Sequence, residues 1–190
     1  MKRAIMSVVV FLSLAECSSE AMATPVNPNS VVVDNIAYYI QTDKAVYNLT
    51  ENVEMLYRVT NLTENPVDIG EVLKGDCWAN FLITDQADVD IWQYVREIPP
   101  CDWEMLHLEP YESKELQITW DMISDNGTFF DHDDDYPVGP GLYNITGELT
   151  LSASYERVPV SVSIGIIPEP ATIFLLAVGA IIEIRRWQTL

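Results

Sequence analysis

The chain has 190 residues, of which 29 are acidic and 10 are basic, so its formal net charge is −19 at pH 7. An acidic excess of this size repels phosphate backbones and anionic lipids, and it therefore argues against a nucleic-acid-binding protein. The same excess favours high solubility and binding to divalent cations or basic partners, although a solvated acidic surface would produce it without any partner.

The first 23 residues have the pattern of a secretory signal peptide. Lys2 and Arg3 precede an apolar stretch over residues 4–15, and Ala21 and Ala23 supply small residues at the two positions that a signal peptidase recognises. The apolar stretch is shorter than the roughly 20 residues that a membrane span requires. We therefore predict an exported chain that is cleaved before residue 24, the alternative being a buried N-terminal strand.

Residues 24–167 have the length of one domain, and their apolar pattern is that of an all-β protein. Val53, Met55, Tyr57 and Val59 recur at every second position, which is the period of a strand with one buried face. Turn-forming residues recur about every 8–12 residues, as they do in sandwiches and barrels of antiparallel strands. The expected strands cover residues 31–42, 53–60, 67–72, 78–84, 89–95, 105–108, 114–120, 142–151 and 158–166.

The longest segment without a strand pattern covers residues 121–141, and a loop of this length is usually functional or mobile. It contains Asp131, Asp133 and Asp135, whose alternating carboxylates are the kind of oxygen ligands that calcium prefers. The spacing differs from that of an EF-hand, because Tyr136 stands where that loop has its glycine. The segment therefore predicts either a calcium site or a solvated acidic loop.

Cleavage of the signal peptide would leave two cysteines, Cys77 and Cys101. An even number of cysteines in an exported domain favours one disulfide, because the compartments outside the inner membrane are oxidising. Closing this loop would stabilise the fold by about 3–3.5 kcal/mol on the chain-entropy estimate. The alternative is that both cysteines remain as buried thiols.

Few residues are candidates for catalysis. The chain has two histidines, His107 and His132, and it contains no recognisable nucleophile elbow, phosphate-binding loop, dinucleotide-binding motif or zinc-protease motif. Asp76 and Asp102 adjoin the two cysteines, and their charge disfavours the thiolate that a nucleophilic cysteine needs. The sequence therefore predicts a non-enzymatic protein without catalytic residues.

In the last 23 residues, Pro168-Glu169-Pro170 is followed by a short apolar segment over residues 171–182 and then by the basic pair Arg185-Arg186. These three features resemble, in order, the recognition motif, the short membrane segment and the basic end of the PEP-CTERM sorting signal of Gram-negative bacteria. The resemblance implies a short transmembrane helix in the inner membrane and an exosortase-type processing enzyme as a partner. Because the arginines belong on the cytoplasmic side, the acidic domain would lie outside. A GPI-anchor signal is the rival, but such signals usually end in apolar sequence.

The body of the chain, over residues 40–150, contains a series of short motifs, which in chain order are Tyr47-x-Leu49-x-Glu51-x-Val53, Thr60-Asn61-x-Thr63, Ile91-Trp92, Leu108-x-Pro110-x-Glu112, Trp120-Asp121 and Gly139-Pro140-Gly141-x-Tyr143-x-Ile145-x-Gly147. By their order and spacing, these motifs resemble the BsuPI-type intracellular proteinase inhibitor domain. The resemblance implies an immunoglobulin-like antiparallel β-sandwich and proteinase inhibition. The matching residue types are those that fill cores and make turns, so they indicate no protease-contacting loop.

These features predict a signal peptide over residues 1–23, an immunoglobulin-like sandwich over residues 24–167 and a sorting signal over residues 168–190. The expected function is that of an exported, surface- or envelope-associated binding module for a protein or an extracellular polymer. Its location would be periplasmic, membrane-anchored or extracellular in a Gram-negative bacterium. The alternatives are a proteinase inhibitor of the BsuPI type, with a protease as its partner, and a calcium-stabilised structural protein of the extracellular matrix or biofilm.

Overall fold

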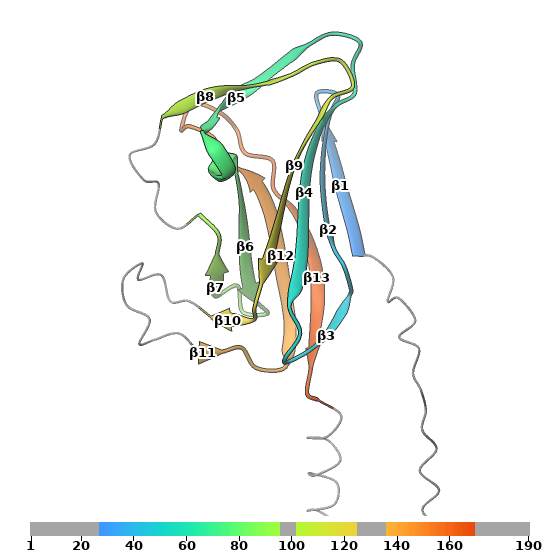
Figure 1. The fold of residues 1–190 in the computed structure, drawn as a ribbon, viewed down its shortest axis with the longest axis vertical. Coiled ribbons are helices and arrows are strands. Elements are labelled where there is room, and N and C mark those ends of the chain that lie inside the picture. The colour runs from blue at the N-terminus through green and yellow to red at the C-terminus, as the bar shows by residue number, and fades with distance from the viewer. Residues whose placement is uncertain (1–26, 96–101, 125–135, 170–190) are drawn as a thin grey trace, which may run out of the picture.

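The structure of the protein is a computed structural model that describes residues 27–95, 102–124 and 136–169 (Figure 1). The elements in chain order are β1 (Asn27–Val33), β2 (Ile36–Thr42), β3 (Val46–Asn48), β4 (Val53–Asn61), β5 (Val67–Leu73), the 3-10 helix η1 (Gly75–Trp78), β6 (Ala79–Asp85), β7 (Asp90–Gln93), β8 (Trp103–Leu108), β9 (Ser113–Trp120), β10 (Ile123–Ser124), β11 (Tyr136–Pro137), β12 (Gly141–Leu149) and β13 (Val160–Ile167). The expected signal peptide and terminal transmembrane helix lie outside these ranges, and within them no helix is long and apolar enough to cross a membrane.

Two sheets pack face to face and enclose the core. One has the strand order β1-β2-β4-β9 and the other the order β3-β13-β12-β6-β7. The alternating apolar residues of β4 point inward, and Val53, Met55, Tyr57 and Val59 are completely buried against residues such as Ile145 of β12. A separate two-stranded antiparallel sheet of β5 and β8 extends past one end of the two sheets (Figure 1). The predicted all-β sandwich is thus confirmed.

The connectivity is that of an immunoglobulin-like domain. β2, β4 and β9 lie in one sheet and β6, β12 and β13 in the other, while β3 joins β13 in parallel at an edge. Near the start of β12, the hydroxyl of Tyr143 donates a hydrogen bond to the carbonyl oxygen of Gly139 at 2.8 Å, as in the tyrosine corner of such domains. Trp78 lies buried just before β6, where these domains carry a core tryptophan. The immunoglobulin-like class is therefore confirmed as well.

The expected single strand over residues 31–42 is instead a hairpin of β1 and β2. Asp34 and Asn35 form its two-residue turn with φ angles of 50° and 62°, which Asp and Asn tolerate better than other non-glycine residues. The side-chain amides of Asn27 and Asn29 then donate to the carbonyl oxygens of Ser163 and Ser161 at 2.6 and 2.7 Å. β3 pairs with β13 over residues 165–167. The side chains of β1 therefore cover the preceding part of that edge of β13, at Ser161 and Ser163.

The residues that carry the resemblance to the inhibitor domain serve the fold. The side-chain amide of Asn61 donates to the carbonyl oxygens of Asn65, Leu108 and Glu109, and its Oδ1 accepts from the backbone N–H and the hydroxyl of Thr63. Further motif residues are buried in the core, namely Tyr47, Val53, Trp120, Tyr143 and Ile145. These motif residues thus stabilise the sandwich, and they do not indicate a ligand site.

Candidate functional site

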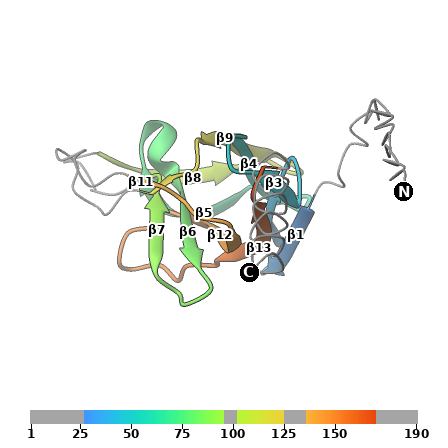
Figure 2. The same cartoon turned by 90° about the horizontal axis from the view of Figure 1, so that it is seen from below.

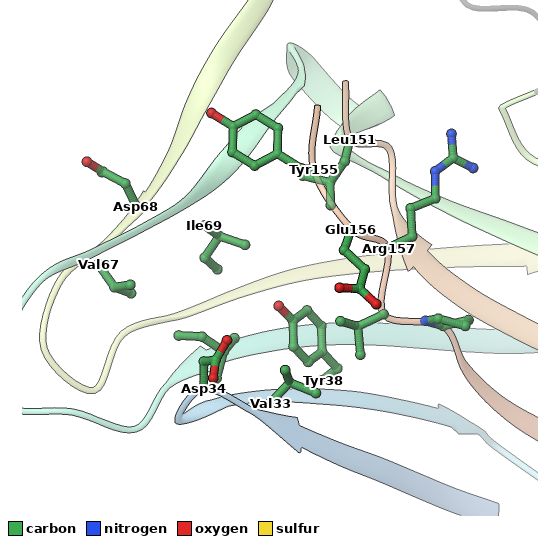
Figure 3. Close-up of a pocket in the computed structure, with 13 residues that line it drawn as sticks. Val33, Asp34, Tyr38, Val67, Asp68, Ile69, Leu151, Tyr155, Glu156 and Arg157 are labelled. Atoms are coloured by element: carbon green, nitrogen blue, oxygen red, sulfur yellow. The ribbon is translucent and has the colours of Figure 1, made fainter. Parts of the chain in front are cut away.

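A cavity of about 420 Å³ lies at the end of the sandwich from which the two-stranded β5–β8 sheet extends (Figure 3). We call it the end pocket. Three separate parts of the chain form it: the β1–β2 turn with the start of β2, the first half of β5, and residues 151–159 between β12 and β13. Its apolar walls come from Val33, Ile36, Val67, Ile69, Leu151 and Val158. The volume falls within the roughly 300–1,000 Å³ of typical small-ligand sites.

A β-bulge in β5 shapes one wall of the end pocket. Asp68 pairs with His107 and Gly70 pairs with Leu106, so Ile69 is the extra residue on this strand. A bulge breaks the strict alternation of side chains, and as a result both Asp68 and Ile69 line the cavity. Bulges commonly occur where a strand has to redirect a side chain toward a site.

Gly70 allows the opposite wall to approach β5 closely. A Cβ atom at this position would lie 2.9 Å from both Leu151 Cδ2 and Tyr155 Cδ1, which is too close for any side chain. The segment is also tied to β5 by its backbone, because Ser152 N donates to Glu71 O at 3.0 Å and Leu151 forms a β-bridge with Val72. The segment that carries Tyr155 is therefore fixed to β5 by backbone hydrogen bonding.

Tyr38 of β2 supplies a buried polar group that faces the cavity. The residue is 6% exposed, and its hydroxyl points into the end pocket between Asp34 and Glu156 (Figure 3). Within the described part of the chain, this hydroxyl has no hydrogen-bond partner. Burial, and to a smaller extent the negative charge of Asp34, raises the pKa of the Tyr38 phenol, so it remains a neutral hydroxyl. The side chain is buried, but its oxygen is not among the fully buried polar atoms, so a ligand group in the cavity can reach it.

The charged residues at the rim give the end pocket a negative character. Arg157 is turned away from Tyr38 and bonds to Glu148 through its Nη1 at 2.9 Å (Figure 3). The carboxylates of Asp34 and Glu156 line the cavity and have no ion-pair or hydrogen-bond partner among the described residues. The one cationic group on the rim is therefore already engaged, whereas two carboxylates are free to meet a ligand.

Asp68, the third acidic residue of the rim, is engaged by a histidine. Its Oδ1 lies 2.7 Å from His107 Nδ1 on the outer face of the β5–β8 sheet. The hydrogen bond to Asp68, followed by the nearby charges of Asp68 and Glu109, raises the pKa of His107. His107 itself lies at the surface beside the pocket. Among the described residues, no serine, threonine or cysteine is joined to His107 or Asp68 by a side-chain hydrogen bond.

Comparison with known proteins bears on the fold alone. A scan against known protein families finds no match, and a search of curated proteins finds none either. Among solved structures, the chain is similar to a β-glucosidase from Erythrobacter marinus, with 16% identity and a TM-score of 0.40 over 75% of this chain and 16% of that one. It is also similar to a CARDB domain from Pyrococcus furiosus in complex with di-metal ions, with 14% identity and a TM-score of 0.38 over 75% and 96% of the two chains.

A third similar structure is a Pseudomonas fluorescens alkylpurine DNA glycosylase bound to DNA, with 11% identity and a TM-score of 0.35 over 65% of this chain and 27% of that one. The chain thus spans less than a third of the length of the two enzymes that it matches. Similarities this distant do not identify what the chain binds or whether it acts on a substrate.

Most residues that the sequence singled out lie outside the described ranges. This holds for Asp131, Asp133 and Asp135 of the predicted calcium loop, for Cys101, and for Pro170, Arg185 and Arg186 of the sorting motif. Among the described residues, no cluster of His, Cys, Asp or Glu side chains could hold a metal ion. The calcium site and the sorting signal therefore remain predictions.

Pro168 and Glu169 are the two described residues of the sorting motif. They follow directly after β13, and Glu169 Oε1 accepts a hydrogen bond from the Thr50 hydroxyl at 2.9 Å. The motif thus begins where the last strand of the sandwich ends, which is compatible with a separate tail.

The region of the predicted disulfide is described on one side. Cys77 is half-buried in η1, and Cys101 is followed by Asp102, whose carbonyl oxygen accepts a hydrogen bond from Lys74 N at 3.1 Å. The Lys74 and Asp102 side chains also lie 3.3 Å apart in an ion pair. Lys74 and Asp102, which flank the loop that the disulfide would close, are therefore adjacent.

We predict that exported protein contains one disulfide between Cys77 and Cys101. Its removal in a Cys77→Ser/Cys101→Ser variant should lower the free energy of unfolding by about 3 kcal/mol, because the unfolded chain regains the entropy of the open loop. Mass spectrometry of a non-reduced digest checks the pairing directly. Recovery of both cysteines as alkylated thiols from exported protein would refute it.

Proposed function

We propose that this protein is an exported, envelope-associated binding module without enzymatic activity, and that the end pocket is its binding site. The observation that carries this proposal is the combination of a cavity of about 420 Å³ with a buried hydroxyl, that of Tyr38, aimed into it without a partner. Ligand sites are typically concave and combine apolar walls with a few convergent polar groups, and the end pocket has both kinds of lining, with a larger polar share than usual.

The chemistry beside the pocket supports binding rather than catalysis. His107 is hydrogen-bonded to Asp68 and exposed on the β5–β8 sheet. It is therefore placed to fix the position of Asp68 at the rim of the pocket rather than to activate a nucleophile. A general base has to lie within hydrogen-bond reach of the group that it deprotonates. The Tyr38 hydroxyl offers a hydrogen-bonding group but, with its raised pKa, is a poor base at neutral pH.

The proposed location rests on the two ends of the chain. Residues 1–23 match a signal peptide, and residues 168–190 match a sorting tail that an exosortase-type enzyme would process. Both lie apart from the sandwich in the sequence, since β1 begins at Asn27 and β13 ends at Ile167. The acidic domain would then face the periplasm or the exterior.

We expect that deleting residues 168–190 releases a soluble domain that stays folded. The sandwich is complete at Ile167, and the deletion removes one described contact, the exposed hydrogen bond between Glu169 and Thr50. Loss of a single exposed contact should change the melting temperature by less than about 4 °C. Circular dichroism and a thermal melt check this. Aggregation, or loss of the β-type spectrum, would mean that the tail belongs to the fold.

Hydrogen exchange tests the binding site. The purified full chain, in mild detergent, is compared with and without a solubilised extract of the envelope and extracellular material of the source cells. We expect slower amide exchange in residues 33–38, 67–70 and 151–159, and unchanged exchange at the opposite end, in β10 and β11. Protection confined to that opposite end, or no protection anywhere, would contradict the proposal.

The resemblance to the inhibitor domain calls for one further assay. A panel of serine, cysteine and metalloproteases is measured with and without the purified protein at micromolar concentration. The binding-module proposal predicts no inhibition, because the matched motif residues lie in the core and in turns. Inhibition of any protease that is lost on a substitution in an exposed loop would establish the inhibitor alternative instead.

A further inference from the structure

We infer that the end pocket binds a cationic group on an aliphatic stem, as in the side chain of a lysine or an arginine presented by a partner protein. This inference rests on the proposed function, whose binding site it uses, and adds the chemical class of the ligand. Four observations lead to it: a hydroxyl without a partner among the described residues, two carboxylates that are likewise free, an engaged arginine, and walls of which about half the surface is apolar.

The Tyr38 hydroxyl provides a hydrogen-bond acceptor at the inner part of the cavity. The side chain is 6% exposed and lines the cavity, and a ligand donor there would use the acceptor capacity of this oxygen. Ammonium and guanidinium groups are donors without acceptor capacity, so they match a phenol oxygen and two carboxylates better than an anion would.

The two free carboxylates stand on different walls of the cavity. Asp34 belongs to the β1–β2 turn and Glu156 to the segment between β12 and β13, and their side chains lie on either side of Tyr38 (Figure 3). A cation between them would form charge-assisted hydrogen bonds, which are roughly twice as strong as neutral ones. Without such a cation, two carboxylates and a buried phenol oxygen face one another across a partly apolar cavity.

Arg157 does not provide the missing positive charge. Its guanidinium is held by Glu148 at 2.9 Å and is directed away from Tyr38 (Figure 3). The whole chain carries a net charge of −19, so its field attracts cations toward the cavity from a distance. The pocket is therefore charged to receive a basic group from outside the chain.

The remaining walls suit the methylene stem of such a side chain. Ile69, Val67 and Leu151 supply aliphatic surface, and the Tyr155 ring packs against Gly70 beside them. Lysine and arginine bury their stems against apolar surface while the charged head makes polar contacts. An aromatic ring near the head adds a cation–π attraction of about 0.5–1 kcal/mol at an exposed site. A neutral sugar would use the rings but leave the carboxylate charges uncompensated.

Methyl NMR of the full chain in detergent tests the inference, because Val, Leu and Ile methyl groups line the cavity. The probes are Nα-acetyl-lysine N-methylamide, its arginine counterpart, the norleucine counterpart that has no charge, and N-acetylglucosamine. We expect saturable shifts of the Val33, Ile69 and Leu151 methyls with both cationic probes at a Kd of about 1 mM, and at least about tenfold weaker binding of norleucine. Equal binding of norleucine, no saturable shift with either cation, or tighter binding of the sugar would overturn it.

Four variants separate the groups involved. Asp34→Asn keeps a residue that tolerates the positive φ of this turn, and Glu156→Gln and Tyr38→Phe keep the shape of their side chains. Each should weaken the lysine probe by about threefold or more, a loss typical of one hydrogen bond. Asp90→Asn, which removes a charge from the exposed strand β7, should leave the affinity unchanged. Equal losses in Asp90→Asn and Asp34→Asn would reduce the effect to general electrostatics and refute the site.

Two results distinguish this inference from the proposed function. If the envelope extract protects the end pocket in hydrogen exchange while the cationic probes fail to bind, the pocket is a binding site for a different ligand class. If neither experiment gives a signal at the pocket, the proposed function fails together with the inference.

Discussion

Replacing Trp120 with alanine is expected to lower the free energy of unfolding by about 3–5 kcal/mol, which is the usual cost of removing a buried tryptophan. Trp120 ends β9, is 1% exposed and lies edge-on to Tyr143 with ring centroids 6.2 Å apart. Its indole N–H donates to the carbonyl oxygen of Ile123 at 3.0 Å. The substitution therefore opens a cavity between the two sheets and leaves that carbonyl without its donor.

Urea denaturation followed by circular dichroism measures this effect, and Trp103→Ala is the matched control. Trp103 is 38% exposed on β8, so its removal should cost less than about 1 kcal/mol. Similar losses for the two variants would show that Trp120 is not part of the core that joins the sheets.

Replacing Asn61 with alanine should destabilise the domain by about 2–4 kcal/mol, because several buried polar groups lose their partners at once. The Asn61 side chain is completely buried, and it connects β4 to the turn after it and to the end of β8 through the carbonyl oxygens of Asn65, Leu108 and Glu109. The loss should appear as a lower urea midpoint with an unchanged slope.

Asn65→Ala is the control for this prediction. Asn65 lies four residues further in the same turn and is exposed, and it contributes its backbone carbonyl and N–H rather than its side chain. Its substitution should change stability by no more than about 0.5 kcal/mol. If Asn61→Ala were equally mild, the hydrogen bonds of Asn61 would not determine the geometry of this turn.

Alternation in the sequence predicted most of the strands and the fold class. The two-residue period of Val53, Met55, Tyr57 and Val59 reports one buried face, and this is a local property that needs no tertiary information. β3 was missed because it has three residues, too few to display a period. The β1–β2 turn was missed because Asp34 and Asn35 interrupt a run of Val, Ile and Tyr that otherwise resembles one long strand.

The end pocket could not be predicted in the same way. Tyr38, Ile69 and Tyr155 belong to three segments that are far apart in the sequence, and they converge because three separate sheets meet at this end of the domain. The bulge at Ile69 also shifts the register of β5 against β8, which the sequence alone does not reveal. The Asp34–Asn35 turn was the one local signal of a special backbone near the site. Figure 2 shows the fold from below, with β1 beside β13 and β6 beside β7.

The residues of the proposed binding site are thus separate from those that hold the fold. Asn61, Trp120 and Tyr143 hold the immunoglobulin-like frame, and they are the residues that make the sequence resemble an inhibitor domain. Tyr38, Asp34 and Glu156 stand outside those motif positions and line the end pocket. A resemblance carried by frame residues predicts a fold well, but it gives no information on the ligand.

Filling the end pocket tests the central claim most directly. Val33 and Val31 lie on the same strand, β1, and each is 38% exposed, but Val33 alone of the two lines the cavity. Chains without residues 168–190, carrying Val33→Trp or Val31→Trp, are mixed with washed envelopes and extracellular material, and the co-sedimenting fraction is measured alongside a thermal melt. The account predicts that the unsubstituted chain and Val31→Trp co-sediment equally, and that a folded Val33→Trp loses most of its bound fraction. A folded Val33→Trp that co-sediments as well as the unsubstituted chain would contradict it.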